Sequence, residues 1–363
     1  MRIVKVPLGS RTYSIWIGRD LLRRLGPECA RQKLGRRCAV ISDEHVAPLY
    51  GKLALAGLLS SGFEPVLITV PAGERAKSLK TVQSCYDQLA EHRLERKSFV
   101  VALGGGVVGD LAGFVAATFL RGVPFVQVPT TLLAQVDSSV GGKVGVNLKA
   151  GKNLVGAFYQ PRFVLCELQA LESLPMREFR AGLAEVIKYG IIYDARLFRL
   201  LEKEIAPLLE REPRLLERVI ARCCAIKADV VGQDETESGL RAILNFGHTI
   251  GHALEVISGY GEFLHGEAIS LGQVAAAELS AKVLGFPRSE ADRVRNLLDK
   301  AGLPTSLKLT PARIQKLGSA MRLDKKVSEG VVKFVLARRL GQVEFGHAIP
   351  MQEVEQALIA LSG

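Results

Sequence analysis

The segment that decides the fold reads Ser98-Phe-Val-Val-Ala-Leu-Gly-Gly-Gly-Val-Val-Gly-Asp110. Its first six residues form a short apolar run that stops at three glycines, which predicts a buried strand followed by a tight turn. The residues after the glycines are apolar as far as Phe119 apart from Asp110, and they predict a packed helix. The five glycines and the central acid of Val100–Phe119 argue against a membrane span. A strand, a glycine turn and a helix form one unit of a parallel α/β sheet.

Similar apolar runs and helical patterns flank this unit on both sides. The predicted strands are Arg2–Val6, Thr12–Ile17, Cys38–Ser42, Pro65–Val70, Ser98–Leu103 and Phe125–Val128. The first two form a hairpin, and helical patterns follow the third and fourth. Apolar strands separated by helices are typical of a doubly wound parallel sheet. Ligands of such sheets bind beyond the carboxyl ends of the strands, where Asp43, Gly104–Gly106 and Thr130-Thr131 lie.

The second half of the chain has a different pattern. Helical periodicity dominates from about Leu174 to about Ala320, and one late strand, Val331–Leu336, precedes a helix that begins at Met351. Because 363 residues are too many for one ordinary core, we expect two domains. Residues 1–170 are predicted to form a nucleotide-binding α/β domain, and residues 171–363 a mostly helical domain that binds metal and substrate. We expect the active site in the cleft between them.

The composition indicates a globular protein with a basic surface. Hydrophobic residues make up 48% of the chain, charged residues make up 23%, and the formal net charge is +11. The basic residues are spread along the chain without a recognition module, which favours a small anionic substrate and argues against nucleic acid and membrane partners. The six cysteines form no C-x-x-C pair and the amino terminus lacks a signal-peptide core, so we expect a cytoplasmic protein with reduced thiols.

The glycine turn matches the pattern G-x-G-x-x-G from Gly104 to Gly109. Such a turn lets a pyrophosphate approach the backbone at a helix N-terminus. The match is imperfect, because no acid occurs between Asp110 and Asp137 and the turn follows the third α/β strand, so a tight packing turn is an alternative. Asp43 is a candidate for the ribose, and the alternative for Asp43 is a helix cap before His45.

Lysines and carboxylates occur in three further patterns, each with two interpretations. Lys143 and Lys152-Asn153 lie in glycine-rich turns, which is typical of a phosphate clamp or of an exposed hairpin. Glu185 and Lys188 are three residues apart in an apolar helical segment. They could form an ordinary helix ion pair, or a buried pair that serves a functional site. The run Asp324-Lys325-Lys326 is a solvated loop unless a substrate needs further cations.

Three of the six histidines, His248, His252 and His265, fall within eighteen residues. Clustered imidazoles hold divalent metals or transfer protons, and a catalytic zinc takes three protein ligands and one open position. His248 and His252 are four apart and share a helix face, so spacing nominates them as a pair. Spacing does not decide between that pair and His248 with His265.

Taken together, the motifs are similar to those of one family. The chain resembles the 3-dehydroquinate synthase family over nearly its whole length, in order and spacing. The matching strings are 104–110, Phe119-Leu-Arg-Gly122, 129–143, 151–161, 182–190, Leu244-Asn-Phe-Gly-His-Thr-Ile-Gly-His252 and His265-Gly-Glu-Ala268. Departures are small: Cys166-Glu167 replaces an apolar residue and Asp, and Gln273 replaces a common Met.

The resemblance implies an NAD- and metal-dependent phosphate lyase of the shikimate pathway, which leads to chorismate and the aromatic amino acids. The family cyclises 3-deoxy-D-arabino-heptulosonate 7-phosphate (DAHP), a sugar acid phosphate, to 3-dehydroquinate plus phosphate. The steps are a transient oxidation of the substrate by NAD, elimination of phosphate, re-reduction and aldol closure. The competing interpretations are another sugar-phosphate cyclase and a metal-dependent polyol or glycerol-phosphate dehydrogenase. A homodimer is the family's habit.

The resemblance also implies roles for individual residues. The metal, zinc or cobalt, falls on Glu185, His248 and His265, which leaves His252 to handle protons. The implied catalytic residues are Asp137, Lys143, Lys188, Arg241, Asn245 and His252. The implied substrate-binding residues are Arg121, Lys152, Asn153, Lys227, Lys325 and Lys326. The implied NAD-binding residues are Asp43, Glu74, Lys77, Gly105, Gly106, Asp110, Thr130 and Thr131.

Overall fold

The structure is a computed structural model that describes residues 1–259, 262–322 and 332–361. Contacts divide the chain into two compact units. Unit 1 comprises Met1–Leu174 and Leu216–Gly232, and unit 2 comprises Pro175–Leu215 and Gln233–Gly363. Residues 216–232 therefore group with the first unit, whereas the sequence analysis assigns them to the second domain. The predicted contacts of Lys325 and Lys326 lie outside the described residues, as does Val331.

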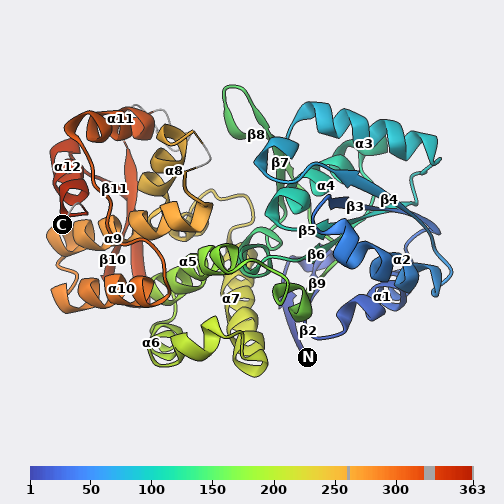
Figure 1. Ribbon diagram of the computed structural model, residues 1–363, viewed down its shortest axis with the longest axis horizontal. Helices are drawn as coiled ribbons and strands as arrows, with labels where there is room; N and C mark the ends of the chain where they lie inside the picture. The colour runs from blue at the N-terminus through green and yellow to red at the C-terminus, as the bar shows by residue number, and fades with distance from the viewer. Residues whose placement is uncertain (260–261, 323–331, 362–363) are drawn as a thin grey trace. The chain divides into compact units, whose positions relative to one another are not determined.

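Unit 1 contains a seven-stranded sheet with helices on both faces (Figure 1). Its strands are β1 (Arg2–Val6), β2 (Tyr13–Gly18), β3 (Arg37–Asp43), β4 (Glu64–Val70), β5 (Phe99–Gly104), β6 (Phe125–Pro129) and β9 (Phe163–Glu167), with a separate hairpin of β7 (Lys143–Leu148) and β8 (Gly151–Phe158). Its helices are α1 (Leu25–Arg31), α2 (Lys52–Leu59), α3 (Leu79–Glu91), α4 (Gly106–Thr118) and most of α7 (Pro213–Gln233).

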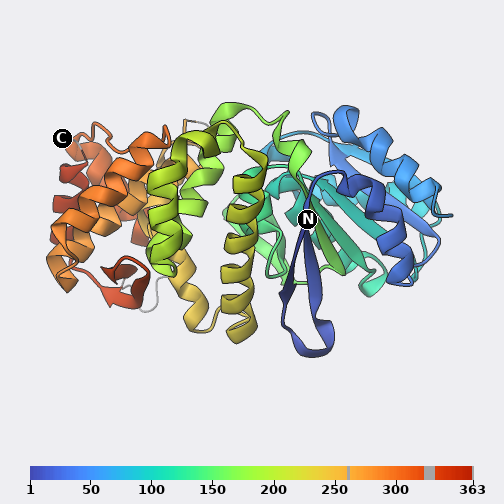
Figure 2. The same ribbon diagram turned by 90° about the horizontal axis from the view of Figure 1, so that it is seen from below.

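The strand order is β1-β2-β9-β6-β5-β3-β4. Only β1 and β2 pair antiparallel, at one edge of the sheet (Figure 2), and the other neighbours pair parallel. The predicted parallel α/β sheet is confirmed. Strand β9 is absent from the prediction, although its five buried residues join the terminal hairpin to the rest of the sheet.

The two faces of the sheet follow from alternation along β3. Cys38 and Val40 pack in the cluster that contains residues of α1 and α2, whereas Ala39 and Ile41 pack in the cluster that contains residues of α3 and α4. Successive side chains of a strand point to opposite faces, and both faces here are covered, so the run is apolar throughout.

The predicted strand, turn and helix of the opening segment are confirmed as β5 and α4, with Gly105 as the N-cap residue of α4. Eight of the thirteen α4 residues are buried, which explains why the segment is almost entirely apolar. Strands β3, β5 and β6 end at Asp43, Gly104 and Pro129, so these ends share one edge. No helix among the described residues is long and apolar enough to cross a membrane.

Unit 2 is mostly helical, as predicted (Figure 1). Its elements are α5 (Met176–Ile192), α6 (Ala195–Leu209), the short 3-10 helix η8 (Leu240–Asn245), α8 (His248–Ile257), α9 (His265–Leu284), α10 (Arg288–Lys300), α11 (Pro311–Arg322), the hairpin β10 (Lys333–Arg339) and β11 (Gln342–Ala348), and α12 (Met351–Ala360). Helix α9 lies at the centre and contacts α5, α8, α10, α12 and β10. The late strand is β10, and its partner β11 is absent from the prediction.

Candidate active site

The carboxyl edge of the unit 1 sheet presents backbone groups and hydroxyls. The Thr130 amide donates to the Gly104 carbonyl at 3.0 Å, which fastens the end of β6 to the glycine turn. The Thr130 hydroxyl is buried and has no hydrogen-bond partner among the described residues. The Thr131 hydroxyl accepts the Ala134 amide at 3.1 Å, at the start of the short π-helix η6 (Ala134–Ser138). A buried hydroxyl without a partner at a strand end is suited to a ligand.

The glycine turn is packed as well as open to a ligand. A Cβ on Gly104 would lie 2.6 Å from Val108, on Gly105 3.0 Å from Thr131, and on Gly106 3.0 Å from Ser138. Side chains at these positions would push against α4 or the loop after β6. The interpretation of the turn as a tight packing turn therefore holds. The same turn leads into the N-terminus of α4, and a helix N-terminus favours a bound phosphate.

The buried side chain of Lys77 is the centre of a polar network in unit 1. Its Nζ lies 2.7 Å from Asp110 Oδ2, 2.5 Å from Asn153 Oδ1 and 4.0 Å from Glu74 Oε1. Burial raises the pKa of Asp110, and the Lys77 ammonium partly offsets this effect. The structure thus brings together four predicted residues from three separate segments of the sequence.

A second lysine–carboxylate pair in unit 1 joins α7 to η6. Lys227 Nζ donates to the Asp137 carboxylate at 2.7 Å and to the Asp137 carbonyl at 2.8 Å. One turn earlier on α7, the Cys224 thiol donates to the Gln135 carbonyl at 3.2 Å. These bonds explain why residues 216–232 belong to unit 1.

Other predicted residues of unit 1 have simpler surroundings. Asp43 Oδ1 accepts the amides of His45 and Val46 at 2.9 and 3.0 Å, so the capping interpretation holds for one of its oxygens. Arg121 is exposed at the end of the 3-10 helix η5 (Phe119–Arg121), with φ +66°. Lys143 is exposed at the start of β7, and Lys152 is half-buried in the hairpin that was one interpretation of its sequence.

The histidine cluster of unit 2 lies on α8 and α9, next to Glu185 on a third helix, α5. His248 Nε2 lies 3.5 Å from Glu185 Oε1, and His265 Nε2 lies 3.8 Å from the same oxygen. The ring centroids of His248 and His265 are 5.6 Å apart. One donor atom from each of the three residues fits within 4.8 Å of the others, which is the spacing of ligands around one ion.

Glu185 is fully buried, and neither of its oxygens accepts a hydrogen bond from the described residues. The Lys188 ammonium, itself 1% exposed, lies against Oε2 as an ion pair that lacks hydrogen-bond geometry. Buried carboxylates persist when they are paired or coordinate metals. Both interpretations of Glu185 and Lys188 are therefore compatible: they form a helix ion pair, and they adjoin a candidate metal site.

Glycines bring the three helices into contact. A Cβ on Gly266 of α9 would lie 1.8 Å from the Ala181 carbonyl oxygen of α5. A Cβ on Gly272 would lie 2.0 Å from the carbonyl oxygen of Gly247, the N-cap residue of α8. Such backbone contacts require glycine, and they set the distance between His265, Glu185 and His248.

The alternative that spacing left open is visible as a second group. His252, Glu255 and His265 also place one donor atom each within 4.8 Å, and His265 Nδ1 lies 3.3 Å from Glu255 Oε2. The His252 ring is 5.3 Å from that of His248 and 6.1 Å from that of His265. Sequence reasoning missed Glu255, although positions 248, 252 and 255 share one helix face.

The loop before η8 is held by Asp234, which sequence reasoning also missed. Its carboxylate accepts the amides of Ser238, Gly239 and Arg241 at 2.8 to 2.9 Å. Burial opposes the charged form, but these bonds outweigh it and lower the pKa of Asp234 to about 2.

Two predicted residues lie on η8, which follows this loop. Arg241 is 1% exposed and donates to the Glu235 carbonyl, while the Asn245 amide donates to Glu237 Oε1 at 2.9 Å. The loop therefore presents a buried guanidinium and an oriented amide.

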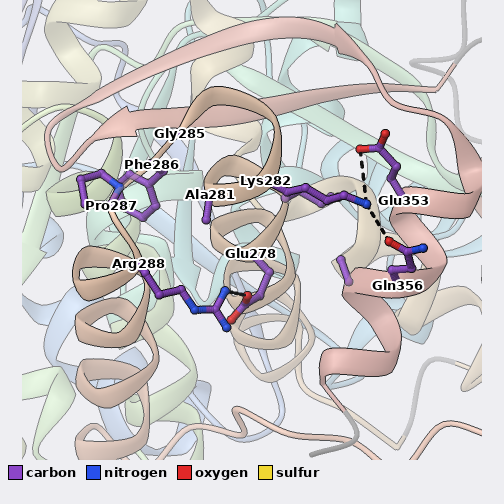
Figure 3. Close-up of a pocket in the computed structure, with 11 residues that line it drawn as sticks. Glu278, Ala281, Lys282, Gly285, Phe286, Pro287, Arg288, Glu353 and Gln356 are labelled. Atoms are coloured by element: carbon purple, nitrogen blue, oxygen red, sulfur yellow. Dashed lines mark hydrogen bonds and ion pairs between the residues drawn. The ribbon is translucent and has the colours of Figure 1, made fainter.

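Unit 2 also has a hollow of about 580 Å³ between α9, α10 and α12. Its charged groups pair with each other, Arg288 with Glu278 and Lys282 with Glu353, and Lys282 also donates to the Gln356 amide oxygen (Figure 3). None of the described residues that line it is a predicted site residue.

Comparison with known proteins decides the family. The model of the 3-dehydroquinate synthase N-terminal domain matches residues 67–181, and that of the C-terminal domain matches residues 182–327. A 3-dehydroquinate synthase from Desulforamulus reducens is 49% identical over 346 residues, which cover 95% of this chain and 96% of the relative. This chain belongs to the 3-dehydroquinate synthase family.

Solved structures similar to this member of the 3-dehydroquinate synthase family include sugar-phosphate cyclases. A 2-epi-5-epi-valiolone synthase from Streptomyces hygroscopicus, solved with NAD+ and Zn²⁺, has a TM-score of 0.87 at 29% identity and 96% coverage of both chains. A 2-deoxy-scyllo-inosose synthase complexed with carbaglucose-6-phosphate, NAD+ and Co²⁺ has a TM-score of 0.86 at 26% identity, covering 98% of this chain and 99% of the other.

Proposed function

We propose that this chain catalyses the reaction of its family, the conversion of DAHP to 3-dehydroquinate and phosphate in the shikimate pathway. The observation that carries the proposal is the 49% identity over nearly the full length of a relative that has this name. The solved cyclases with other products are only 29% and 26% identical, which makes a different cyclase reaction the second candidate.

NAD and one zinc or cobalt ion are the cofactors. We assign the metal to Glu185, His248 and His265, because the buried Glu185 carboxylate accepts no hydrogen bond from the part of the chain that the structure describes, and two imidazole Nε2 atoms face its Oε1. Carboxylate and imidazole ligands suit both metals. When bound, the metal supplies Lewis acidity to the substrate hydroxyls, and NAD accepts and returns a hydride.

We assign NAD to the carboxyl edge of the unit 1 sheet. The Gly105 and Gly106 backbone leads into α4 and would receive the pyrophosphate, and the Thr130 hydroxyl would donate to the cofactor. Asp43 keeps one carboxylate oxygen for a ribose hydroxyl while the other caps the next turn. Glu74, Lys77 and Asp110 would hold the adjoining wall rigid through their network, and Thr131 would fix the loop after β6.

We assign the substrate's anionic groups to cations that the fold holds in place. Buried Arg241 and Lys188 are suited to the carboxylate and the hydroxyls next to the metal ligands, and Lys227 is already oriented by Asp137. Further substrate contacts fall to Arg121, Lys143, Lys152, Asn153 and Asn245, with a lysine of 325–326. His252, half-buried beside both ligand histidines, would move protons to and from a substrate hydroxyl.

We propose the cytoplasm as the location, because all six cysteines are buried and none of them forms a disulfide. We also propose a homodimer, which the family resemblance implies. Size-exclusion chromatography with light scattering tests the dimer.

The test of the function is phosphate release from DAHP by the metal-loaded protein with a catalytic amount of NAD. We expect release that stops with EDTA, no accumulation of NADH, and 3-dehydroquinate as the product. Net NADH formation with polyols would indicate a dehydrogenase. Absence of release from folded, metal- and NAD-loaded protein would move the assignment to another sugar phosphate.

A further inference from the structure

The two ligand imidazoles of the candidate metal site are each held from behind. His248 Nδ1 lies 3.1 Å from the Phe246 carbonyl, and His265 Nδ1 lies 3.3 Å from the Glu255 carboxylate. Both rings therefore direct Nε2 at Glu185 Oε1. A carbonyl or carboxylate at Nδ1 fixes the proton there and leaves the Nε2 lone pair for a cation.

Glu255 has two candidate roles, because it also belongs to the second group with His252 and His265. The difference between the two carboxylates decides between them. Glu185 is fully buried and accepts no hydrogen bond from the described residues; the Lys188 ammonium lies against its Oε2, and its Oε1, which both imidazoles face, is left for a cation. Glu255, which is 7% exposed, already lies within hydrogen-bond distance of an imidazole nitrogen. One ion at Glu185 satisfies the first carboxylate without disturbing the second.

We propose that Glu255 is a positioning residue of the metal site: it fixes the His265 tautomer and adds a negative charge behind it, without binding the ion. Its negative charge makes His265 Nε2 a stronger electron-pair donor to the ion. It also offsets the positive charge of the Lys188 ammonium, which lies against the ligand Glu185. The inference rests on the metal site of the proposed function.

Zn²⁺ affinity measured by chelator competition on the full chain, without NAD or substrate, tests the proposal. We expect E255A to bind Zn²⁺ about 10- to 100-fold more weakly than the wild type. E255Q should retain part of the affinity, because its amide oxygen still accepts the Nδ1 proton. E278Q is the matched control, since Glu278 is a largely buried carboxylate of unit 2 paired with Arg288 and Arg295, and its affinity should be unchanged.

The Co²⁺ absorption spectrum separates positioning from ligation. We expect the visible bands of the E255Q complex to match those of the wild type, because the ligands are the same. A changed Co²⁺ spectrum in E255Q, or wild-type Zn²⁺ affinity in folded E255A, would overturn the proposal. Failure of the wild type itself to bind one Zn²⁺ would instead overturn the metal site of the proposed function.

Discussion

The strand-end cluster of unit 1 and the histidine cluster of unit 2 are built in different ways. In unit 1, parallel strands in register end at one edge, so Asp43, Gly104 and Thr130 come together through the hydrogen-bond ladder. In unit 2, Glu185, His248 and His265 meet where three helices touch backbone to backbone at glycines. The nucleotide site should therefore tolerate single changes better than the metal site.

The largest expected effect is at the metal ligands. We predict that His248→Ala and Glu185→Gln each lose stoichiometric zinc and lower kcat by at least ~10³-fold, because the Lewis acid is worth several kcal/mol. Zinc content and phosphate release measure this. His248→Ala is the cleaner variant, since Glu185→Gln leaves the buried Lys188 ammonium without its carboxylate.

Circular dichroism of both variants serves as the control for folding. Retention of one zinc per chain in a folded variant contradicts the ligand assignment. His252, which the spacing nominates, would then be the alternative ligand.

The next largest effect compares one glycine from each cluster. We predict that Gly266→Ala destabilises the protein by about 3 kcal/mol or more, because its Cβ would lie 1.8 Å from a backbone oxygen that has no room to move. Gly105→Ala should cost about 1 kcal/mol, since its Cβ would lie 3.0 Å from a methyl group of Thr131. Urea denaturation midpoints followed by circular dichroism measure both.

Zinc affinity extends this comparison to the site. Gly266→Ala should weaken zinc binding in the fraction that folds, because α9 carries His265, whereas Gly105→Ala should leave zinc binding unchanged. Equal loss of stability in the two variants would contradict the expectation that a cluster built by strand register tolerates substitution better than one built by helix–helix contacts.

What the sequence predicts depends on whether the contacts are local. The strand, turn and helix at residues 98–119 were predictable, because a buried strand, its glycine turn and its helix follow each other in the chain. Strand β9 was not, because its five residues gain meaning only from pairing with β2 and β6. The same holds for α7, which has an ordinary helical sequence and joins unit 1 through Cys224 and Lys227.

How much of the candidate site can be predicted also depends on whether its contacts are local in the sequence. The sequence predicted that the histidines cluster, but not which of them faces Glu185, because the answer depends on how α8 and α9 cross. The choice of His265 came from the family resemblance. Asp234 and Glu255 were missed because the groups they hold are a folded loop and a ring from another helix.

The third prediction separates substrate from nucleotide within unit 1. Arg121 is exposed at the end of η5, before β6 begins, and its proposed role is to bind an anionic group of DAHP. We predict that Arg121→Ala raises KM for DAHP by about 10- to 100-fold, the worth of one or two charge-assisted hydrogen bonds. NAD affinity, measured by calorimetry, should change by less than about twofold. Equal losses for both ligands would place Arg121 at the nucleotide.

The smallest effect tests the loop of residues 234–241, which a carboxylate shapes as glycines shape the turn of unit 1. We predict that Asp234→Asn lowers stability by about 1–2 kcal/mol, because the asparagine side chain lacks the negative charge that accepts three backbone amides. It should also raise KM for DAHP a few-fold, because the loop carries Arg241. Asp194→Asn is the matched control: Asp194 also accepts two backbone amides in unit 2, at the start of α6, so stability should fall while KM stays constant.

The pH dependence distinguishes this carboxylate from a merely polar cap. The pKa of Asp234 is lowered from 3.8 to about 2, so its charge contributes stability above about pH 4, and this contribution is lost as the pH falls through 2. The difference in urea midpoint between the wild type and Asp234→Asn should therefore be constant from about pH 7 to pH 5 and should shrink below about pH 4. A difference that does not change down to about pH 2 would show that the hydrogen-bond geometry, rather than the charge, holds the loop that presents Arg241.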